Sequence, residues 1–239
     1  MFRKIIFIAF LILCGATIIA EARQLSYKDS TIKKKGDTYS IDINYPEIKD
    51  RVIPTRNREQ VNGEILKFVN SLYDRDLAGF AENFSKFTPK ELERIAGKDL
   101  VEVEYRIVIL DENFISVRFE KYLYNLGAVH GNTEVYGFNY HLKKSKYINL
   151  ADFFEPGADY LKQISDFCIK DLNRQINKSG IFTSSIAEGA GAKEENLKQF
   201  TLGRDDLTIY FGDYQVADYA SGPQEVKIPL KTLKGFQRD

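Results

Sequence analysis

Residues 100–150 decide the fold, and they read LVEVEYRIVIL, DEN, FISVRFEKYLY, NLGAVHGN and TEVYGFNYHLKKSKYINL. In the first run, apolar side chains recur at every second residue from Val101 to Ile109, which is typical of a half-buried strand. Runs 114–124 and 134–142 alternate in the same way, and residues 111–113 have the Asp and Asn content of a tight turn. Three successive strands with short links predict an antiparallel meander that has one solvent-exposed face.

Apolar side chains at helical spacing predict two long helices around this meander. Asn57 is the expected N-cap of the first helix, which continues to about residue 84. The second helix is expected over residues 161–176. Shorter strand patterns occur at residues 39–43, 207–211 and 225–228. These elements predict an α+β fold in which an antiparallel sheet packs against two main helices.

The start of the chain has the pattern of a cleavable secretory signal. Two basic residues precede an apolar run over residues 5–19, and an Ala-Glu-Ala sequence follows it. Lipid anchoring through Cys14 is the disfavoured alternative, because Leu13 stands where lipid attachment needs a small residue. We therefore expect residues 1–22 to be a signal peptide and residues 23–36 a flexible tail. The mature chain is expected to be periplasmic or extracellular, without a transmembrane segment.

Charge and cysteine content limit the classes of partner. The chain has 34 basic and 34 acidic residues, and removal of the signal, with Arg3, Lys4 and Glu21, leaves a net charge of −1. This near neutrality argues against nucleic acid, which needs a basic surface. Cys168 is the one cysteine outside the signal, so no internal disulfide is expected. Its position on the apolar stripe of the second helix favours a buried thiol over a reactive one.

The sequence carries none of the common catalytic or metal-binding motifs. It has no Gly-x-Ser-x-Gly, Ser-x-x-Lys or His-Glu-x-x-His, and only two histidines. His130 and His141 would point to opposite faces of one strand, which disfavours a shared metal. We therefore expect no catalytic residue, no metal and no cofactor. A hydrolytic site made of two Asp or Glu side chains that folding brings together remains an alternative.

The candidate binding residues lie in two loop segments. His130 lies between Gly127 and Gly131, which allow close backbone approach, so its imidazole is a candidate ligand contact at the rim of the sheet. The alternative is a hydrogen-bonded histidine that fixes the strand entry. Tyr214 and Tyr219 form an aromatic contact patch, or else they pack their rings at the sheet edge. The candidates are His130, Asn132, Asp213, Tyr214, Asp218 and Tyr219.

Three segments resemble a family of bacterial extracytoplasmic domains of unknown function. They are residues 127–133 (GAVHGNT), 148–154 (INLADFF) and 207–229, which contains LTIYF, YASGP and VKIP. The family occurs in the outer part of the lysozyme-sensing anti-sigma factor RsiV and in the N-terminal region of the peptidoglycan deacetylase PdaC. The resemblance spans about residues 37–235 and implies two small lobes without established catalytic residues. We expect an N-terminal lobe over residues 37–97 and an RsiV-like C-terminal domain over residues 98–239.

The short N-terminus and the end at Asp239 lead us to expect neither a sigma-factor-binding segment nor a deacetylase domain. The resemblance then favours a non-enzymatic, exported cell-envelope binding domain over an enzyme. It implies an envelope protein such as lysozyme, or a cell-wall glycan, as the partner. The alternative is a peptidoglycan-acting hydrolase that uses an Asp/Glu pair. Lysozymes are basic, so a lysozyme-binding face would be acidic, and its candidate residues are Asp205, Asp206, Asp213 and Asp218.

Overall fold

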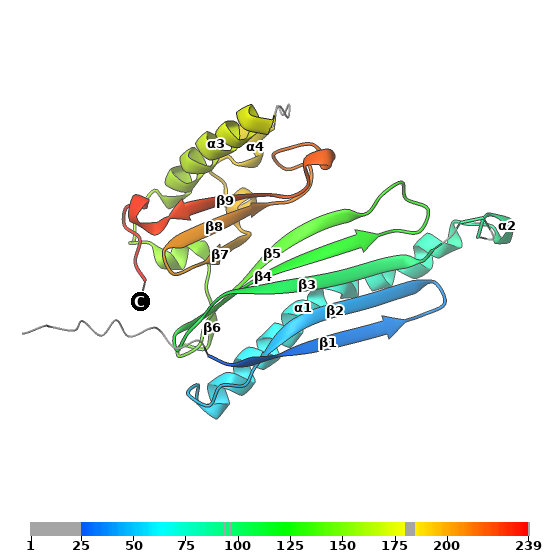
Figure 1. Cartoon of the computed structure of the whole chain (residues 1–239), viewed down its shortest axis with the longest axis horizontal. Helices are drawn as coiled ribbons and strands as arrows, with labels where there is room; N and C mark the ends of the chain where they lie inside the picture. Colours follow the sequence, from blue (N-terminus) through cyan, green and yellow to red (C-terminus); the bar gives the residue numbers. More distant parts are fainter. Residues whose placement is uncertain (1–24, 93, 96, 180–184, 239) are drawn as a thin grey trace, which may run out of the picture.

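The larger lobe is a six-stranded sheet with one long helix along one face (Figure 1). The computed structural model describes residues 25–92, 94–95, 97–179 and 185–238. The strands of this lobe are β1 (Tyr27–Lys35), β2 (Tyr39–Ile48), β3 (Asp99–Leu110), β4 (Phe114–Tyr124), β5 (Asn132–His141) and β6 (Lys146–Tyr147). They are ordered as in the chain, and every neighbouring pair is antiparallel except β2 and β3. A parallel pair needs a long crossover, which helix α1 (Thr55–Ser85) supplies.

Helix α1 supplies the apolar layer against this sheet. Its buried side chains run from Val61 to Phe80 at helical spacing, and they join the core of the larger lobe. The helix begins at Thr55 rather than after the predicted cap, Asn57. The Asn57 side chain instead donates a hydrogen bond to the Leu142 carbonyl at 2.8 Å, which ties the helix start to the end of β5. The short helix α2 (Pro89–Leu92) follows α1.

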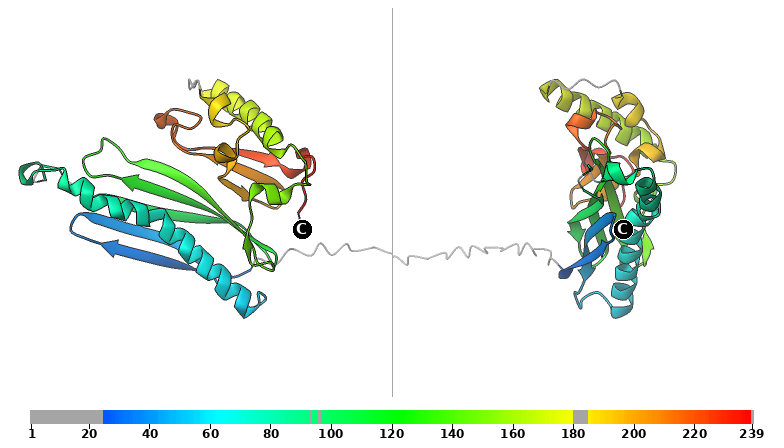
Figure 2. Two further views of the ribbon diagram at one scale, coloured as in Figure 1. Left: turned by 180° about the vertical axis from the view of Figure 1, so that it is seen from behind. Right: turned by 90° about the vertical axis from the view of Figure 1, so that its right-hand side faces the viewer.

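The smaller lobe has its own three-stranded antiparallel sheet and its own hydrophobic core (Figure 2). Its main helix, α3 (Tyr160–Ser179), contributes Ile164, Cys168 and Leu172 to that core. The strands are β7 (Phe200–Leu202), β8 (Asp206–Phe211) and β9 (Gln224–Pro229). The short helical elements are α4 (Ile186–Gly189), α5 (Glu194–Leu197), and the 3-10 turns η1 (Leu150–Phe153), η2 (Tyr219–Ser221) and η3 (Leu230–Thr232).

The α+β class is confirmed, but its organisation differs from the expectation in four ways. The larger sheet is mixed rather than antiparallel, and the two long helices pack on separate sheets. The predicted flexible tail over residues 23–36 is wrong for residues 27–35, because these pair along their whole length with β2. Lysines such as Lys33 are common on edge strands, where they discourage pairing with other chains. The expected lobe boundary after residue 97 is wrong, because it would divide the larger sheet: β2 precedes this residue, β3 follows it, and the two strands pair.

The smaller lobe covers part of the sheet face that the alternation of apolar and polar residues predicted to be exposed to solvent. Ser116 and Asn139 on this face are buried, and Ser116 donates a hydrogen bond of 2.6 Å to the Asn139 amide oxygen. The Asn139 amide donates in turn to the carbonyl of Phe200 at 2.8 Å, while the Leu202 N–H donates to Ser116 at 3.0 Å. Strand β7 therefore docks on β4 and β5 through a buried polar network whose members have partners.

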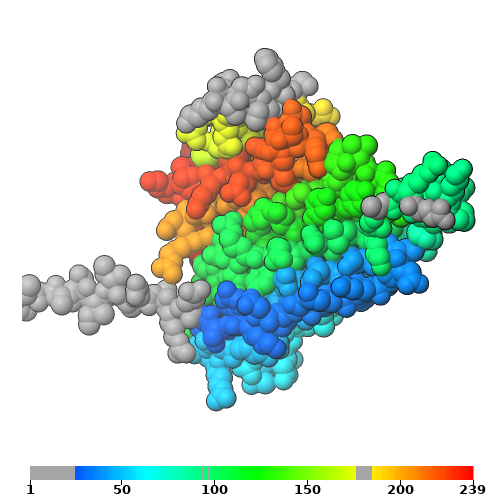
Figure 3. All heavy atoms as spheres, turned by 45° about the vertical axis from the view of Figure 1, so that its right-hand side comes forward, coloured from blue at the N-terminus to red at the C-terminus, as the bar shows by residue number. Residues whose placement is uncertain are grey.

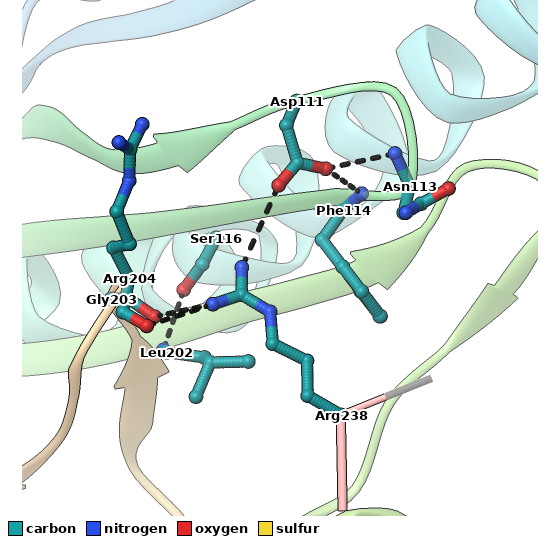
Figure 4. A network of polar contacts seen from close by, with 8 residues as sticks. All are labelled: Asp111, Asn113, Phe114, Ser116, Leu202, Gly203, Arg204 and Arg238. Carbon is teal, nitrogen blue, oxygen red and sulfur yellow. Dashed lines mark hydrogen bonds and ion pairs between the residues drawn. The ribbon is translucent and has the colours of Figure 1, made fainter. Parts of the chain in front are cut away.

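The C-terminal segment fastens the two lobes a second time (Figure 4). The Arg238 guanidinium donates to the carbonyls of Gly203 and Arg204 at 3.2 and 3.0 Å, and it lies 3.5 Å from the Asp111 carboxylate. The other oxygen of Asp111 accepts the N–H groups of Asn113 and Phe114 in the β3–β4 turn, both at 2.8 Å. A charged side chain of the smaller lobe thus joins the turn that begins β4.

The predicted signal peptide, including Cys14, lies outside the described residues. Across the described ranges, no helix is both long and apolar enough to cross a membrane.

Cys168 is fully buried in the core of the smaller lobe, and burial raises the pKa of its thiol to about 12. Because the thiolate is the reactive form, we expect the folded chain to react negligibly with a thiol reagent at pH 8. Unfolding in guanidinium should expose one reactive thiol per mature chain. A colorimetric thiol assay checks this, and rapid labelling of the folded chain would show that the thiol is accessible.

Candidate functional site

Two loops far apart in the sequence meet beside the N-terminal end of β5. One is the β4–β5 hairpin loop (residues 125–131), and the other is the loop after β8 (residues 212–223). The Tyr219 hydroxyl donates a 2.9 Å hydrogen bond to the Gly131 carbonyl, and the Thr133 N–H donates to Asp213 Oδ2 at 2.8 Å. In the space-filling view, the orange loop lies against the green hairpin (Figure 3). The contact brings all six candidate binding residues into one region.

Three of the six candidates form a stack of aromatic rings, which we call the aromatic stack (His130, Tyr214 and Tyr219). Tyr219 is its shared member, with a ring centroid 3.8 Å from that of His130 at an interplanar angle of 22°. The Tyr214 ring stacks on Tyr219 at 5.7 Å and 26°. Desolvation, and then the Asp213 carboxylate, raise the pKa of the Tyr219 hydroxyl, which keeps it a hydrogen-bond donor.

The aromatic stack is open to solvent. Tyr214 is 58% exposed, and Val129, beside His130 in the hairpin loop, is 98% exposed. Tyr214 also has a positive φ of 63°, an unfavourable backbone conformation for a bulky residue. Strain of this kind persists where the surroundings hold it, and it is common at functional sites. Sequence inspection missed Val129, since a lone valine in a loop carries no pattern.

Two of the remaining three candidates support the loops. Asp213 accepts the Thr133 N–H, and its second oxygen is buried without a hydrogen-bond partner among the described residues. Asp218 is the N-cap of η2 and accepts from both the backbone N–H and the hydroxyl of Ser221. Asn132 is exposed at the start of β5, beside the stack. Asp213 and Asp218 thus hold the loop that presents the tyrosines.

A groove of about 590 Å³ begins beside this region and runs between the lobes; we call it the interlobe groove. Its residues come from α1, from β4 and β5, and from the segments before β7 and after β8. Sequence inspection missed it because its walls come from both lobes. Its charged lining residues are Arg75, Asp76, Lys121, Glu134 and Lys198.

A buried ion cluster forms the floor of the groove. The Lys121 side chain is only 6% exposed, and its ammonium lies 2.6 Å from Asp76 and 3.1 Å from Glu134. The Tyr136 hydroxyl donates to Glu134 at 2.9 Å, and burial followed by the Glu134 charge raises the pKa of Tyr136. The sequence did hold a signal for this cluster. Lys121 lies in register with the apolar positions of β4, where a charge must find a partner.

The four aspartates proposed as an acidic face do not lie together. Asp205 and Asp206 stand at the start of β8, whereas Asp213 and Asp218 follow its end. A strand of six residues separates the pairs by about 20 Å. Asp206 is also paired with Lys227 at 3.2 Å. These residues therefore form two small groups rather than one acidic surface.

No group of three His, Cys, Asp or Glu side chains in the described ranges is placed to hold a metal ion. The two histidines lie at opposite ends of β5, and His141 packs its ring against Phe114 at 4.7 Å.

Comparisons with known proteins match each part of this architecture. The family described as "Deacetylase PdaC" matches residues 32–133, and "Protein of unknown function (DUF3298)" matches residues 151–231. The two matches fall mainly on the larger and the smaller lobe, respectively. The resemblance to a PdaC-containing family of unknown function is thereby confirmed, while the relation to RsiV stays a prediction.

Individual relatives agree with these family matches. The chain is 27% identical over 210 residues to the Bacillus subtilis peptidoglycan-N-acetylmuramic acid deacetylase PdaC, covering 88% of this chain and 41% of that protein. It is 27% identical over 113 residues to an esterase of Mycobacterium tuberculosis, covering 47% of this chain and 48% of the esterase. The chain therefore spans less than half the length of either relative.

Two solved structures share the fold. A DUF3298 family member from Bacteroides fragilis superposes with a TM-score of 0.60 at 16% identity, covering 90% of this chain and 94% of that one. A DUF3298 family protein from Pseudomonas aeruginosa gives 0.61 at 15% identity, with coverages of 91% and 96%. At these identities the likeness concerns the fold alone.

Proposed function

We propose that this chain is an exported, non-enzymatic domain that binds a cell-wall glycan, and that the aromatic stack is its contact surface. The observation that carries the proposal is the exposed stack itself. It consists of three aromatic rings, stacked at small interplanar angles, on two loops that hydrogen bonds hold in place. Aromatic faces carry partial negative charge, and the C–H groups on one face of a sugar ring carry partial positive charge. The two surfaces therefore pack together in water.

Polar groups around the stack suit sugar hydroxyls. His130 Nδ1 lies 2.9 Å from the Gly131 carbonyl, so in the neutral ring Nδ1 carries the proton and Nε2 is an acceptor. The exposed Asn132 amide offers both a donor and an acceptor. An aromatic surface with a few fixed polar groups is the usual composition of a ligand site.

A glycan fits the surface better than lysozyme does. Attraction to a basic protein needs a continuous acidic patch, and the candidate aspartates are divided between the two ends of β8. Asp213 and Asp218 are also engaged in holding the loop. Similarity to a protein named as a peptidoglycan deacetylase supports a cell-wall glycan as the ligand and an extracytoplasmic location.

We expect Tyr214→Ala to weaken binding to purified peptidoglycan by about fivefold, since one stacked ring contributes roughly 1 kcal/mol. Tyr214 is largely exposed and its ring contact is with Tyr219, so the melting temperature should change little. Cosedimentation with insoluble peptidoglycan measures the affinity. Tyr27→Ala, at a partly exposed tyrosine on β1, is the matched control and should bind normally. Equal binding by both variants would contradict the role of the stack.

A second candidate function is hydrolysis by an Asp/Glu pair, favoured by the convergence of Asp76 and Glu134 in the interlobe groove. The similarity to an esterase is a further reason to test it. Both carboxylates contact the Lys121 ammonium, an arrangement that also serves as a structural ion cluster. Release of new reducing ends from peptidoglycan, abolished by Glu134→Gln, would establish the hydrolase. If the chain binds peptidoglycan but releases no reducing ends, the result favours the binding domain.

A further inference from the structure

The walls of the interlobe groove carry two cations that lack an ionic partner. Arg75 projects from α1, and Lys198 stands just before β7. Neither forms a salt bridge with any described residue, and both are exposed. Lys121, by contrast, is held by Asp76 and Glu134. The charged lining thus has three cations and two anions, which leaves the groove with an excess of positive charge.

The groove also runs along part of the backbone edge of β5, where Val135 lines it. Strand β6 pairs only with Tyr140 and His141, and no described strand pairs with the preceding part of this edge. Alternate N–H groups of an antiparallel strand point to the same side. The N–H of Thr133 donates to Asp213 and that of Gly137 donates to Gln199, so both point away from β4. The N–H of Val135 lies between them and points the same way, toward the groove that Val135 lines.

These features are continuous with the aromatic stack. Gly212 and Glu134 line the groove, and their chain neighbours Asp213 and Thr133 form the hydrogen bond beneath the stack. Val135 is two residues along β5 from Thr133, a rise of about 7 Å. A sugar on the stack would therefore place a substituent of its own, or of the next sugar, within the mouth of the groove.

We infer that the groove binds a carboxylate carried by the glycan, with the Val135 N–H as donor and Arg75 and Lys198 as the cations. This inference rests on the proposed function, because the stack must anchor the sugar chain. A carboxylate accepts hydrogen bonds from a backbone N–H and from a guanidinium, and charge-assisted bonds are stronger than neutral ones. The excess positive charge of the groove selects an acidic glycan over a neutral one of the same length.

The test compares two tetrasaccharides by calorimetry on the purified chain. One is a neutral oligomer of N-acetylglucosamine, and the other is a peptidoglycan tetrasaccharide in which alternate sugars carry a carboxylate. We expect the acidic tetrasaccharide to bind about tenfold more tightly at low ionic strength, because two partly exposed ion pairs together contribute roughly 1.4 kcal/mol. Salt should reduce this preference.

The Arg75→Gln/Lys198→Gln double variant should abolish the preference while leaving the affinity for the neutral oligomer unchanged. Lys193→Gln, at an exposed lysine outside the groove lining, is the control and should keep the preference. Equal preference in the double variant and the unmodified chain would overturn the carboxylate subsite, as would equal binding of both sugars by the unmodified chain. Absence of binding by either sugar would instead overturn the proposed function.

Discussion

Gly137→Ala is expected to lower the free energy of unfolding by about 3 kcal/mol, the upper part of the range for overpacking a close contact. Gly137 lies in β5 where the smaller lobe approaches, and a Cβ there would overlap the carbonyl oxygen of Phe200. The obstacle is backbone, so it cannot rotate away. The shift would also weaken the hydrogen bond from the Gly137 N–H to Gln199. Urea denaturation measures the loss.

Gly79→Ala is the matched control for this substitution. Gly79 lies within α1 and a Cβ there would meet no atom within 4 Å. Alanine has the higher helix propensity, so this variant should gain about 1 kcal/mol. If Gly137→Ala were as stable as the unmodified chain, the close approach of β7 to β5 would not exist in solution.

Lys121→Met is expected to cost about 3 kcal/mol at pH 7, the low end for removing one partner of a buried ion pair. Methionine keeps most of the apolar stem of lysine but leaves two carboxylates, Asp76 and Glu134, without their shared cation. Glu134 is 42% exposed, so water screens part of its charge, which places the expected loss at this end of the range. Thermal and urea denaturation measure it.

Two further variants identify the cause. Lys67→Met removes an ion-paired lysine that is 73% exposed, and it should cost less than about 0.5 kcal/mol. Adding Asp76→Asn to Lys121→Met should recover part of the loss, since one unpaired charge is then removed. A double variant no more stable than Lys121→Met alone would show that the ion cluster does not account for the effect.

Local patterns predicted the central strands well, because their determinants lie in neighbouring residues. The second run of the meander was predicted over residues 114–124, and β4 has these bounds. Alternation could not reveal that the other face of β4 is also covered. Ser116 looked like a solvent-facing residue, yet it is buried because a partner surface arrives from 86 residues further along the chain. Small polar residues serve equally well in water and in a buried hydrogen-bonded network.

The edge strand and the lobe boundary were missed for a related reason. Residues 27–35 contain four lysines and one isoleucine, so no apolar alternation marks them as a strand. Their structure comes from pairing with β2.

The parallel pairing of β2 with β3 joins segments on either side of α1, and a crossover of this length leaves no local signal at residue 97.

The candidate site was predictable in its residue types but not in its arrangement. Aromatic and glycine-flanked loop residues drew attention to His130, Tyr214 and Tyr219, and the structure brings their rings together. The interlobe groove depends on the docking of two lobes, and its exposed cations resemble ordinary surface charges in the sequence. Such residues can be recognised as part of a binding site only when the surfaces that face them are known.

The most direct measurement of glycan binding by the aromatic stack is a heteronuclear NMR titration of the isotope-labelled chain with the neutral tetrasaccharide. Binding at the stack predicts saturable shifts of the backbone amides of residues 129–133 and 213–221. Amides of β1, on the far edge of the larger sheet, should not move. Shifts confined to β1 or to α3, or no shifts at millimolar sugar, would contradict the assignment of the stack as the glycan-binding surface.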